Sequence, residues 1–139
     1  MKKITIVYWS GTGNTEAMAN AIADGAREGG NEVKLLSVDK ASPSDIEEAE
    51  AVALGCPSMG AEVLEESEME PFVDSIQSVI SGKNLALFGS YDWGNGEWMQ
   101  DWQQRMESYG ANLVDDGLTI NLEPDAEGIE KCKSLGAKL

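Results

Sequence analysis

Hydroxyl and glycine residues that could hold an anion lie together near the N-terminus, in the order Ser10, Gly11, Thr12, Gly13, Asn14 and Thr15. A β-branched run precedes them at residues 4–7, and apolar residues four apart follow at Met18, Ile22 and Ala26. The segment is therefore predicted to join a strand to a helix N-terminus, where unpaired backbone N–H groups and the helix dipole favour negative charge. Its two glycines let the backbone approach an anion closely.

The composition of this loop excludes two common nucleotide sites. A P-loop needs a lysine after its second glycine, and a dinucleotide fingerprint needs a third glycine where this chain has Glu16. Without lysine or arginine, the loop suits one terminal phosphate better than a triphosphate with its magnesium. The alternative is a capped helix with no ligand, because Ser, Thr, Asn and Gly are ordinary at such positions.

Two later irregular loops, at residues 56–68 and 90–96, each carry a large side chain close to glycine. These are Met59 in the first loop and Trp93 in the second. A thioether and an indole could enclose a flat aromatic ligand whose phosphate lies in the first loop. The alternative is that both side chains fill the core. The sequence assigns no role to Trp9.

Predicted strands and helices alternate along the whole chain. Apolar runs predict strands at residues 4–7, 33–38, 51–55 and 84–89, and a fifth in one or two pieces within 113–120. One helical turn is expected within 46–50, and longer helices are expected after the first loop, from Pro71 to a stop at Gly82, over 97–109 and from Pro124. Helical spacing places Trp98 and Trp102 in the core.

The strands are short continuous apolar runs, which are typical of a parallel sheet buried on both faces. Right-handed crossovers then give a doubly wound open sheet, in which ligands bind beyond the carboxyl ends of the strands. All three loops follow strand ends, so we expect them to converge on one site. The 139 residues have the size of a single domain, 1–139.

Composition limits the possible partners. The chain has 10 Lys and Arg against 25 Asp and Glu, a formal charge of −15, which disfavours nucleic acid and membrane surfaces and favours partners with basic patches. The first strand is too short for a signal peptide or a membrane span, which predicts a cytoplasmic protein, and the charge fits a monomer. The absence of histidine excludes a Ser-His-Asp hydrolase, and Cys56 and Cys132 form no Cys-x-x-Cys motif.

Three motifs together resemble those of the flavodoxins. Ser10–Thr15 is similar to their phosphate loop, Met59–Glu62 to the loop over the flavin N5 edge, and Tyr91–Gly94 to the stacking loop. The resemblance runs the whole length. It is closest to the short-chain flavodoxins of anaerobic bacteria, which share the acidic run at Glu62–Glu68 and the tryptophan-glycine pattern at Trp93–Met99.

This resemblance implies an α/β fold with a doubly wound open five-stranded parallel sheet, order 2-1-3-4-5, and helices on both faces. It also implies a low-potential one-electron carrier, not an enzyme, that holds FMN noncovalently and shuttles between semiquinone and hydroquinone. Trp93 and Met59 would cover the two flavin faces, and Glu62 would accept a hydrogen bond from flavin N3. The candidate cofactor-binding residues are Ser10, Gly11, Thr12, Gly13, Asn14, Thr15, Pro57, Ser58, Met59, Gly60, Ala61, Glu62, Ser90, Tyr91, Asp92, Trp93, Gly94 and Leu122.

Three of these candidates depart from the family pattern. Pro57 stands where close relatives have a hydroxyl residue, Leu122 where they have an asparagine, and Ala61 where a polar residue can occur. These departures affect individual hydrogen bonds to FMN and do not argue against FMN as the cofactor. Gly60 is further expected to present its carbonyl to flavin N5 through a peptide flip. The carboxylates crowded into residues 62–74 disfavour added negative charge nearby, which would make the flavin a strong reductant.

Two other functions occur on chains of this topology. A flavodoxin-like quinone or NAD(P)H reductase needs a second pocket, and the chain has no insertion long enough to build one obviously. A receiver-type signalling domain needs a phosphoacceptor aspartate after the third strand, where residues 54–56 read Leu, Gly and Cys instead. The carrier is therefore the favoured interpretation.

Overall fold

The computed structural model of the protein describes residues 2–59 and 63–139. It contains a parallel sheet in the order β2-β1-β3-β4, and two short strands, β5 and β6, share the next position. Of these two, β5 pairs with the start of β4, and β6 pairs with its end. The strands are β1 (Lys3–Tyr8), β2 (Glu32–Ser37), β3 (Ala51–Gly55), β4 (Asn84–Tyr91), β5 (Asn112–Leu113) and β6 (Leu118–Asn121).

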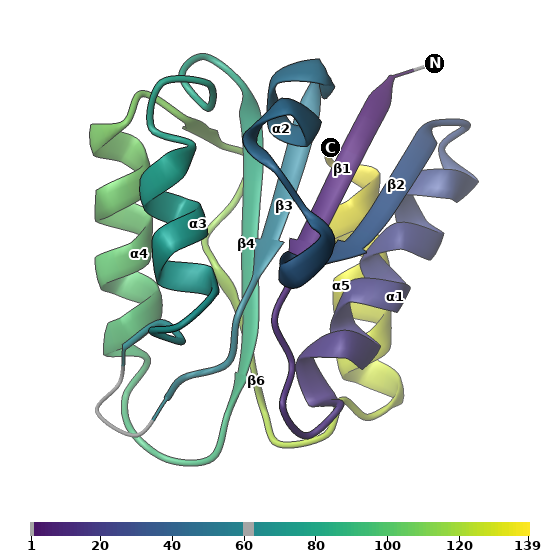
Figure 1. The fold of residues 1–139 in the computed structure, drawn as a ribbon. Helices are drawn as coiled ribbons and strands as arrows, with labels where there is room; N and C mark the ends of the chain where they lie inside the picture. Colours follow the sequence, from purple (N-terminus) through teal and green to yellow (C-terminus); the bar gives the residue numbers. More distant parts are fainter. Residues whose placement is uncertain (1, 60–62) are drawn as a thin grey trace.

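Helices cover both faces of this sheet (Figure 1). Two of them, α1 and α5, pack together on one face, and α2, α3 and α4 lie on the other. The helices are α1 (Asn14–Glu28), α2 (Pro43–Glu48), α3 (Met69–Ser75), α4 (Glu97–Ser108) and α5 (Ala126–Ala137), with a 3₁₀ turn η1 (Val38–Lys40). The predicted fold class and strand order are confirmed, and the fifth strand is in two pieces.

Helix boundaries differ from the predicted ones where local hydrogen bonds decide them. Helix α2 begins at Pro43, earlier than the predicted turn, because the backbone N–H of Ser42 donates to the carboxylate of Asp45 at 2.9 Å. Helix α3 ends at Ser75, well before Gly82, because i to i+3 hydrogen bonds replace the α-helical pattern after it. Helix α5 begins after Pro124 because Asp125 caps it.

Alternation along the central strands divides the core into two layers. Val52 and Leu54 of β3 belong to the layer under α3 and α4, whereas Ala51 and Ala53 belong to the layer under α1 and α5. Trp98 and Trp102 are buried in the first layer, as predicted. Each strand therefore contributes side chains to both faces, which makes the sheet a rigid base for the loops at its ends.

Helices α1 and α5 approach each other at two glycines. A Cβ atom at Gly25 would lie 2.1 Å from the carbonyl oxygen of Lys133, and one at Gly136 would lie 2.1 Å from that of Ile22. This close crossing holds α1 against the sheet and so positions its N-terminus. Within residues 2–59 and 63–139, no helix combines the length and the apolar character that crossing a bilayer requires.

Candidate functional site

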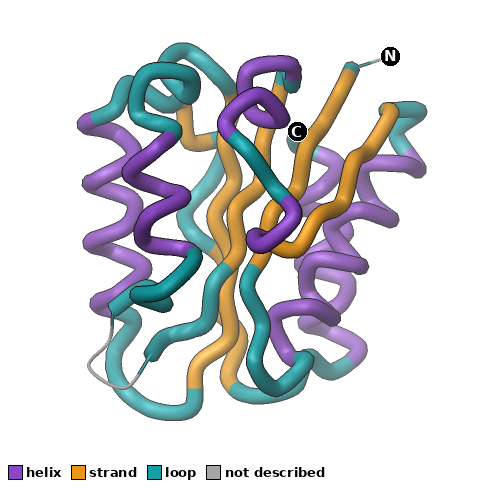
Figure 2. The backbone as a smooth tube through the Cα atoms, in the orientation of Figure 1, coloured by secondary structure: helices purple, strands orange, loops and turns teal. Residues whose placement is uncertain are grey.

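Three loops meet at the carboxyl edge of the sheet, where β1, β3 and β4 end (Figure 2). They line a common hollow of about 170 Å³. The predicted convergence of the loops is therefore confirmed. The lining residues are Trp9, Gly11 and Thr12 after β1, Pro57, Ser58 and Met59 after β3, and Ser90, Tyr91 and Asp92 at the end of β4.

The loop after β1 leaves several backbone donors free at the start of α1. Gly13 has a left-handed backbone (φ 97°), which glycine adopts without strain, and the hydroxyl of Ser10 accepts from its N–H at 3.1 Å. Among the described residues, no acceptor pairs with the backbone N–H groups of Thr12, Asn14 or Thr15. These groups and the positive end of the helix dipole can hold an anion.

An acidic side chain lies close to this loop and is held by a tyrosine. The carboxylate of Glu16, in the first turn of α1, accepts a hydrogen bond from the hydroxyl of Tyr8 at 2.9 Å. Burial and this contact raise the pKa of Tyr8, so its hydroxyl stays protonated and keeps donating at neutral pH. The tyrosine thus satisfies the carboxylate beside the free N–H groups of the loop.

Ser90 connects the loop after β1 with the other two loops. Its hydroxyl lies 3.0 Å from that of Thr15, and its backbone N–H donates to the same Thr15 oxygen at 3.3 Å. The carbonyl of Ser90 accepts from the backbone N–H of Ser58 at 3.0 Å. Both hydroxyls of the pair are buried. One residue at the end of β4 therefore joins all three loops.

The loop after β4 is supported from the end of β6. The side-chain amide of Asn121 donates to the carbonyls of Tyr91 and Asp92 at 3.1 and 3.4 Å, and the backbone N–H of Leu122 donates to Tyr91 at 2.8 Å. Asn121 was not among the predicted site residues, although its position at the end of the fifth strand is a usable signal. Leu122 is half exposed with φ 58°, and Trp93 is 59 % exposed. Trp93 therefore offers an open aromatic face.

Trp9, to which the sequence assigned no role, also belongs to this site. Its backbone N–H donates to Gly55 at 3.0 Å, which extends the pairing of β1 with β3, and its indole N–H donates to Glu68 at 3.3 Å. A Cβ atom at Gly11 would lie 3.1 Å from the indole ring, so only glycine fits comfortably against it. Trp9 and Gly11 also line a second hollow of about 760 Å³, together with Lys40 of η1. Lys40 follows β2 in the chain, so the predicted order, with β2 beside β1, could have placed Lys40 near the loop after β1.

Glu65 fixes the start of α3 beside the site. Its carboxylate accepts from the backbone N–H groups of Ser67, Glu68 and Met69 at 2.7, 2.8 and 3.0 Å, and from the Ser67 hydroxyl. Burial alone would raise the pKa of Glu65, but these hydrogen bonds outweigh it and the pKa is lowered. In the sequence this glutamate is only one of the carboxylates crowded into residues 62–74, whereas the structure makes it a buried cap.

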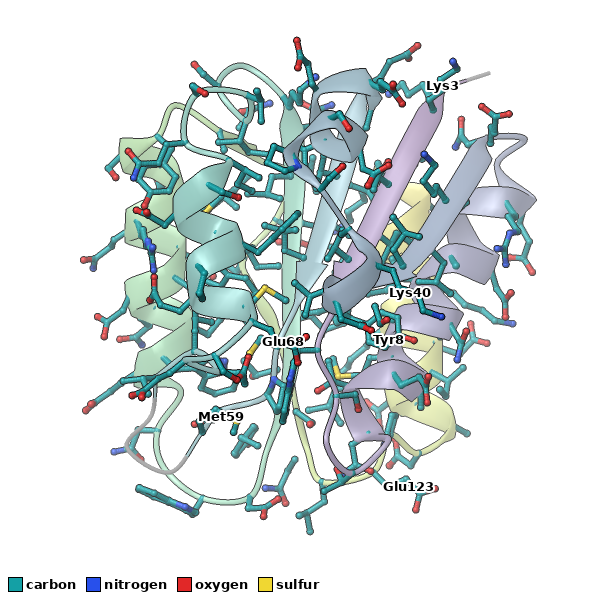
Figure 3. The ribbon with its side chains drawn as sticks, viewed as in Figure 1. Lys3, Tyr8, Lys40, Met59, Glu68 and Glu123 are labelled. Carbon is teal, nitrogen blue, oxygen red and sulfur yellow. The ribbon has the colours of Figure 1, made fainter. Side chains whose placement is uncertain are left out.

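The loop after β3 is described on both sides of residues 60–62. The predictions for Gly60, Ala61 and Glu62 lie outside the described residues. Met59 lies at the carboxyl edge, and its backbone N–H donates to Val63 at 3.1 Å (Figure 3). Burial raises the pKa of the Cys56 thiol to about 12, so this residue stays a neutral thiol at the base of the loop.

Comparison with known proteins identifies the family. A family model described as flavodoxin matches residues 6–136. The chain belongs to the flavodoxin family. It is 48% identical to a flavodoxin of Clostridium beijerinckii over 134 residues, covering 96% of each chain, and 44% identical to a flavodoxin of Megasphaera elsdenii, covering 96% of this chain and 95% of that one.

The fold agrees with a solved flavodoxin structure. The solution structure of two-electron reduced Megasphaera elsdenii flavodoxin superposes with a TM-score of 0.88 at 43% identity, covering 97% of this chain and 96% of that one. The predicted resemblance to short-chain flavodoxins is confirmed. Like other flavodoxins, the chain is a small electron carrier that uses FMN, working between its semiquinone and hydroquinone, and is not an enzyme.

Proposed function

We propose that the three loops at the carboxyl edge form the FMN site, with the phosphate at the N-terminus of α1. The observation that carries this proposal is the set of free N–H groups at Thr12, Asn14 and Thr15, on the loop that lines the common hollow. These donors fit a phosphate, because the positive end of the helix dipole attracts an anion and the N–H groups form strong hydrogen bonds to its charged oxygens. When bound, FMN supplies reversible one-electron chemistry, and the chain supplies binding and electrostatics.

The side chains of the site divide the work of binding. Because the Ser10 hydroxyl accepts two backbone N–H groups, its own proton is available for an anion. Met59 lines the hollow and Trp93 stands exposed on the loop after β4, which suits one side chain for each face of a flat ring. The hydrogen bonds from Asn121 to this loop keep the tryptophan in place.

The acidic run near the site supports a low potential, although not through all of its members. Glu70 forms a two-point ion pair with Arg105 at 2.7 and 2.6 Å, so its field is largely neutralised. The carboxylates of Glu65 and Glu68 meet only neutral donors in the contacts described above. Their charge disfavours a further negative charge close by, and a cofactor there becomes the stronger reductant.

The surface around the site favours a basic protein partner. The net charge of −15 repels acidic surfaces and steers basic ones. Three large apolar side chains stand exposed among the described residues, Val63, Trp93 and Leu122, and all three belong to segments at the carboxyl edge. We infer a monomeric cytoplasmic carrier that docks this edge against basic patches of redox proteins.

Raising the salt concentration should slow electron delivery to such a partner by about tenfold or more, because salt screens the attraction between the two proteins. Stopped-flow rates that do not change with salt would show that electrostatic attraction does not drive this docking.

Ligand titration of the FMN-free protein tests the site. Riboflavin lacks the phosphate but keeps the flavin ring, so calorimetry should show FMN binding at least about a hundredfold more tightly, as expected for several charge-assisted hydrogen bonds. Equal affinities for the two ligands would place the phosphate elsewhere and overturn the assignment of the loop at residues 10–15.

A further inference from the structure

The hydroxyl pair of Thr15 and Ser90 joins residues 75 positions apart in the sequence, inside the protein. Thr15 is 1% exposed and Ser90 is 4% exposed, and their hydroxyl oxygens lie 3.0 Å apart. The backbone N–H of Ser90 points at the same Thr15 oxygen, at 3.3 Å. Thr15 is the second residue of α1, and its side chain contacts β4 at Ser90.

The number of protons in this pair restricts how it can be arranged. A hydroxyl donates one hydrogen bond and accepts two. If Thr15 donated to Ser90, the Ser90 proton would need another acceptor, and within residues 2–59 and 63–139 its hydroxyl has Thr15 as its hydrogen-bond partner. If Ser90 donates instead, Thr15 accepts from both the hydroxyl and the N–H of Ser90, and its own proton is free for an anion. Both buried protons then have acceptors once a phosphate is present.

We propose that Ser90 is a positioning residue that orients the Thr15 hydroxyl proton toward the FMN phosphate. This inference rests on the proposed function, which places that phosphate at the N-terminus of α1. Ser90 itself acts through Thr15 and makes no contact with the phosphate. Ser90 immediately precedes Tyr91, the first residue of the stacking loop. The residue that orients Thr15 of the phosphate loop is therefore also the one at which the stacking loop leaves β4.

Binding measurements on Ser90→Ala, Thr15→Val and the double variant test this role. Each FMN-free protein is titrated with FMN and, separately, with riboflavin. Ser90→Ala should weaken FMN binding about three- to tenfold, the loss expected for one hydrogen bond, and leave riboflavin binding within about twofold. In the Thr15→Val background, Ser90→Ala should have no further effect on FMN, because the hydroxyl it orients is gone.

The control is Ser78→Ala, which removes an exposed hydroxyl in the turns after α3 and should change neither affinity. Urea unfolding of each variant separates a loss of folded protein from a loss of binding. A Ser90→Ala variant that loses FMN and riboflavin affinity equally would show that Ser90 acts through the stacking loop, and unchanged FMN affinity or additive losses with Thr15→Val would also overturn the inference. Wild-type protein that binds both ligands equally would instead overturn the proposed phosphate site.

Discussion

The amino edge of the sheet, where the strands begin, and the carboxyl edge, where they end, both carry hollows. Only the carboxyl edge is suited to a ligand. At the amino edge, residues of β1, β2 and α2 line a hollow of about 320 Å³, larger than the 170 Å³ hollow shared by the three loops. Figure 3 shows Lys3 at the amino edge and Met59 and Glu123 toward the opposite one. The second hollow beside Trp9 and Gly11 has about 760 Å³, so hollows both smaller and larger than that of the amino edge lie at the carboxyl edge. Volume alone therefore does not distinguish the two edges.

Hydrogen bonding distinguishes the edges. At the amino edge several polar groups pair with one another. Asp45 accepts from Lys34 at 3.0 Å and from the Ser42 N–H at 2.9 Å, and Thr5 donates to the Asp45 carbonyl. At the carboxyl edge, the backbone N–H groups of Thr12, Asn14 and Thr15 at the start of α1 have no acceptor within the described chain. A fold that leaves donors free at a helix N-terminus provides binding capacity there.

The largest effect is expected beneath the carboxyl edge, at Trp98. Its indole N–H donates to Cys56 at 3.1 Å, and its ring lies 6.0 Å from that of Tyr91, so it supports two of the three loops. Trp98→Ala should lower the free energy of unfolding of the FMN-free protein by about 3–5 kcal/mol, because it leaves a cavity and an unpaired carbonyl. Urea denaturation measures this; a loss below about 1 kcal/mol would mean that the loops do not depend on this core.

Trp93 gives the opposite result with the same substitution. Because its side chain is 59% exposed, Trp93→Ala should change the free energy of unfolding by less than about 0.5 kcal/mol. It should weaken FMN binding by about 2–3 kcal/mol, since an aromatic surface that the ligand covers is lost. Urea denaturation and FMN calorimetry on Trp98→Ala and Trp93→Ala distinguish a residue that supports the loops from one that contacts the ligand. Unchanged FMN affinity in Trp93→Ala would show that Trp93 is not part of the site.

Glu65 should make the carboxyl edge sensitive to acid. Hydrogen bonds lower its pKa in the folded state, so its stabilisation is complete above the ordinary glutamate pKa and is lost as the pH falls through the lower folded-state pKa. Glu65→Gln should cost about 1–2 kcal/mol of unfolding free energy at pH 7, and this difference should shrink below pH 4. Urea unfolding across pH 3–7 checks it; a difference that is independent of pH would show that the charge is unimportant.

The smallest effect is expected at the amino edge. Asp45→Ala removes the carboxylate that bonds to Ser42 and Lys34, and the lost cap should cost about 1 kcal/mol of stability. FMN affinity should stay unchanged, because the sheet separates this edge from the loops. If calorimetry showed a tenfold weaker FMN complex, the two edges would be coupled and their comparison would fail.

Most of the fold could be predicted from the sequence, because the information is local. Apolar runs bounded by glycine specify the buried strands, and the alternation of strands and helices specifies the parallel order. The helix boundaries that differ from the predicted ones also have physical causes. The start of α2 depends on the Ser42 and Asp45 cap, and the early end of α3 on a change of hydrogen-bond pattern after Ser75.

The site could be predicted only in part, because some of its contacts are not local. The loop at residues 10–15 carries its own pattern of hydroxyls and glycines. By contrast, the Thr15 and Ser90 pair depends on how α1 sits against β4, and Asn121 supports the loop after β4 because β6 lies beside that strand. Trp9 depends on the register of β1 with β3. Such contacts follow from topology and not from spacing along the chain.

Amide NMR spectra of the FMN-free, nitrogen-15-labelled protein test the central claim most directly, because each edge has its own reporters. Saturating FMN should shift the amides of Thr12, Asn14 and Thr15, and saturating riboflavin should leave these near their free positions. Both ligands should shift Trp93, and neither should shift Lys34 at the amino edge. Amides of residues 10–15 that do not respond to FMN, or an amino edge that does, would contradict the account.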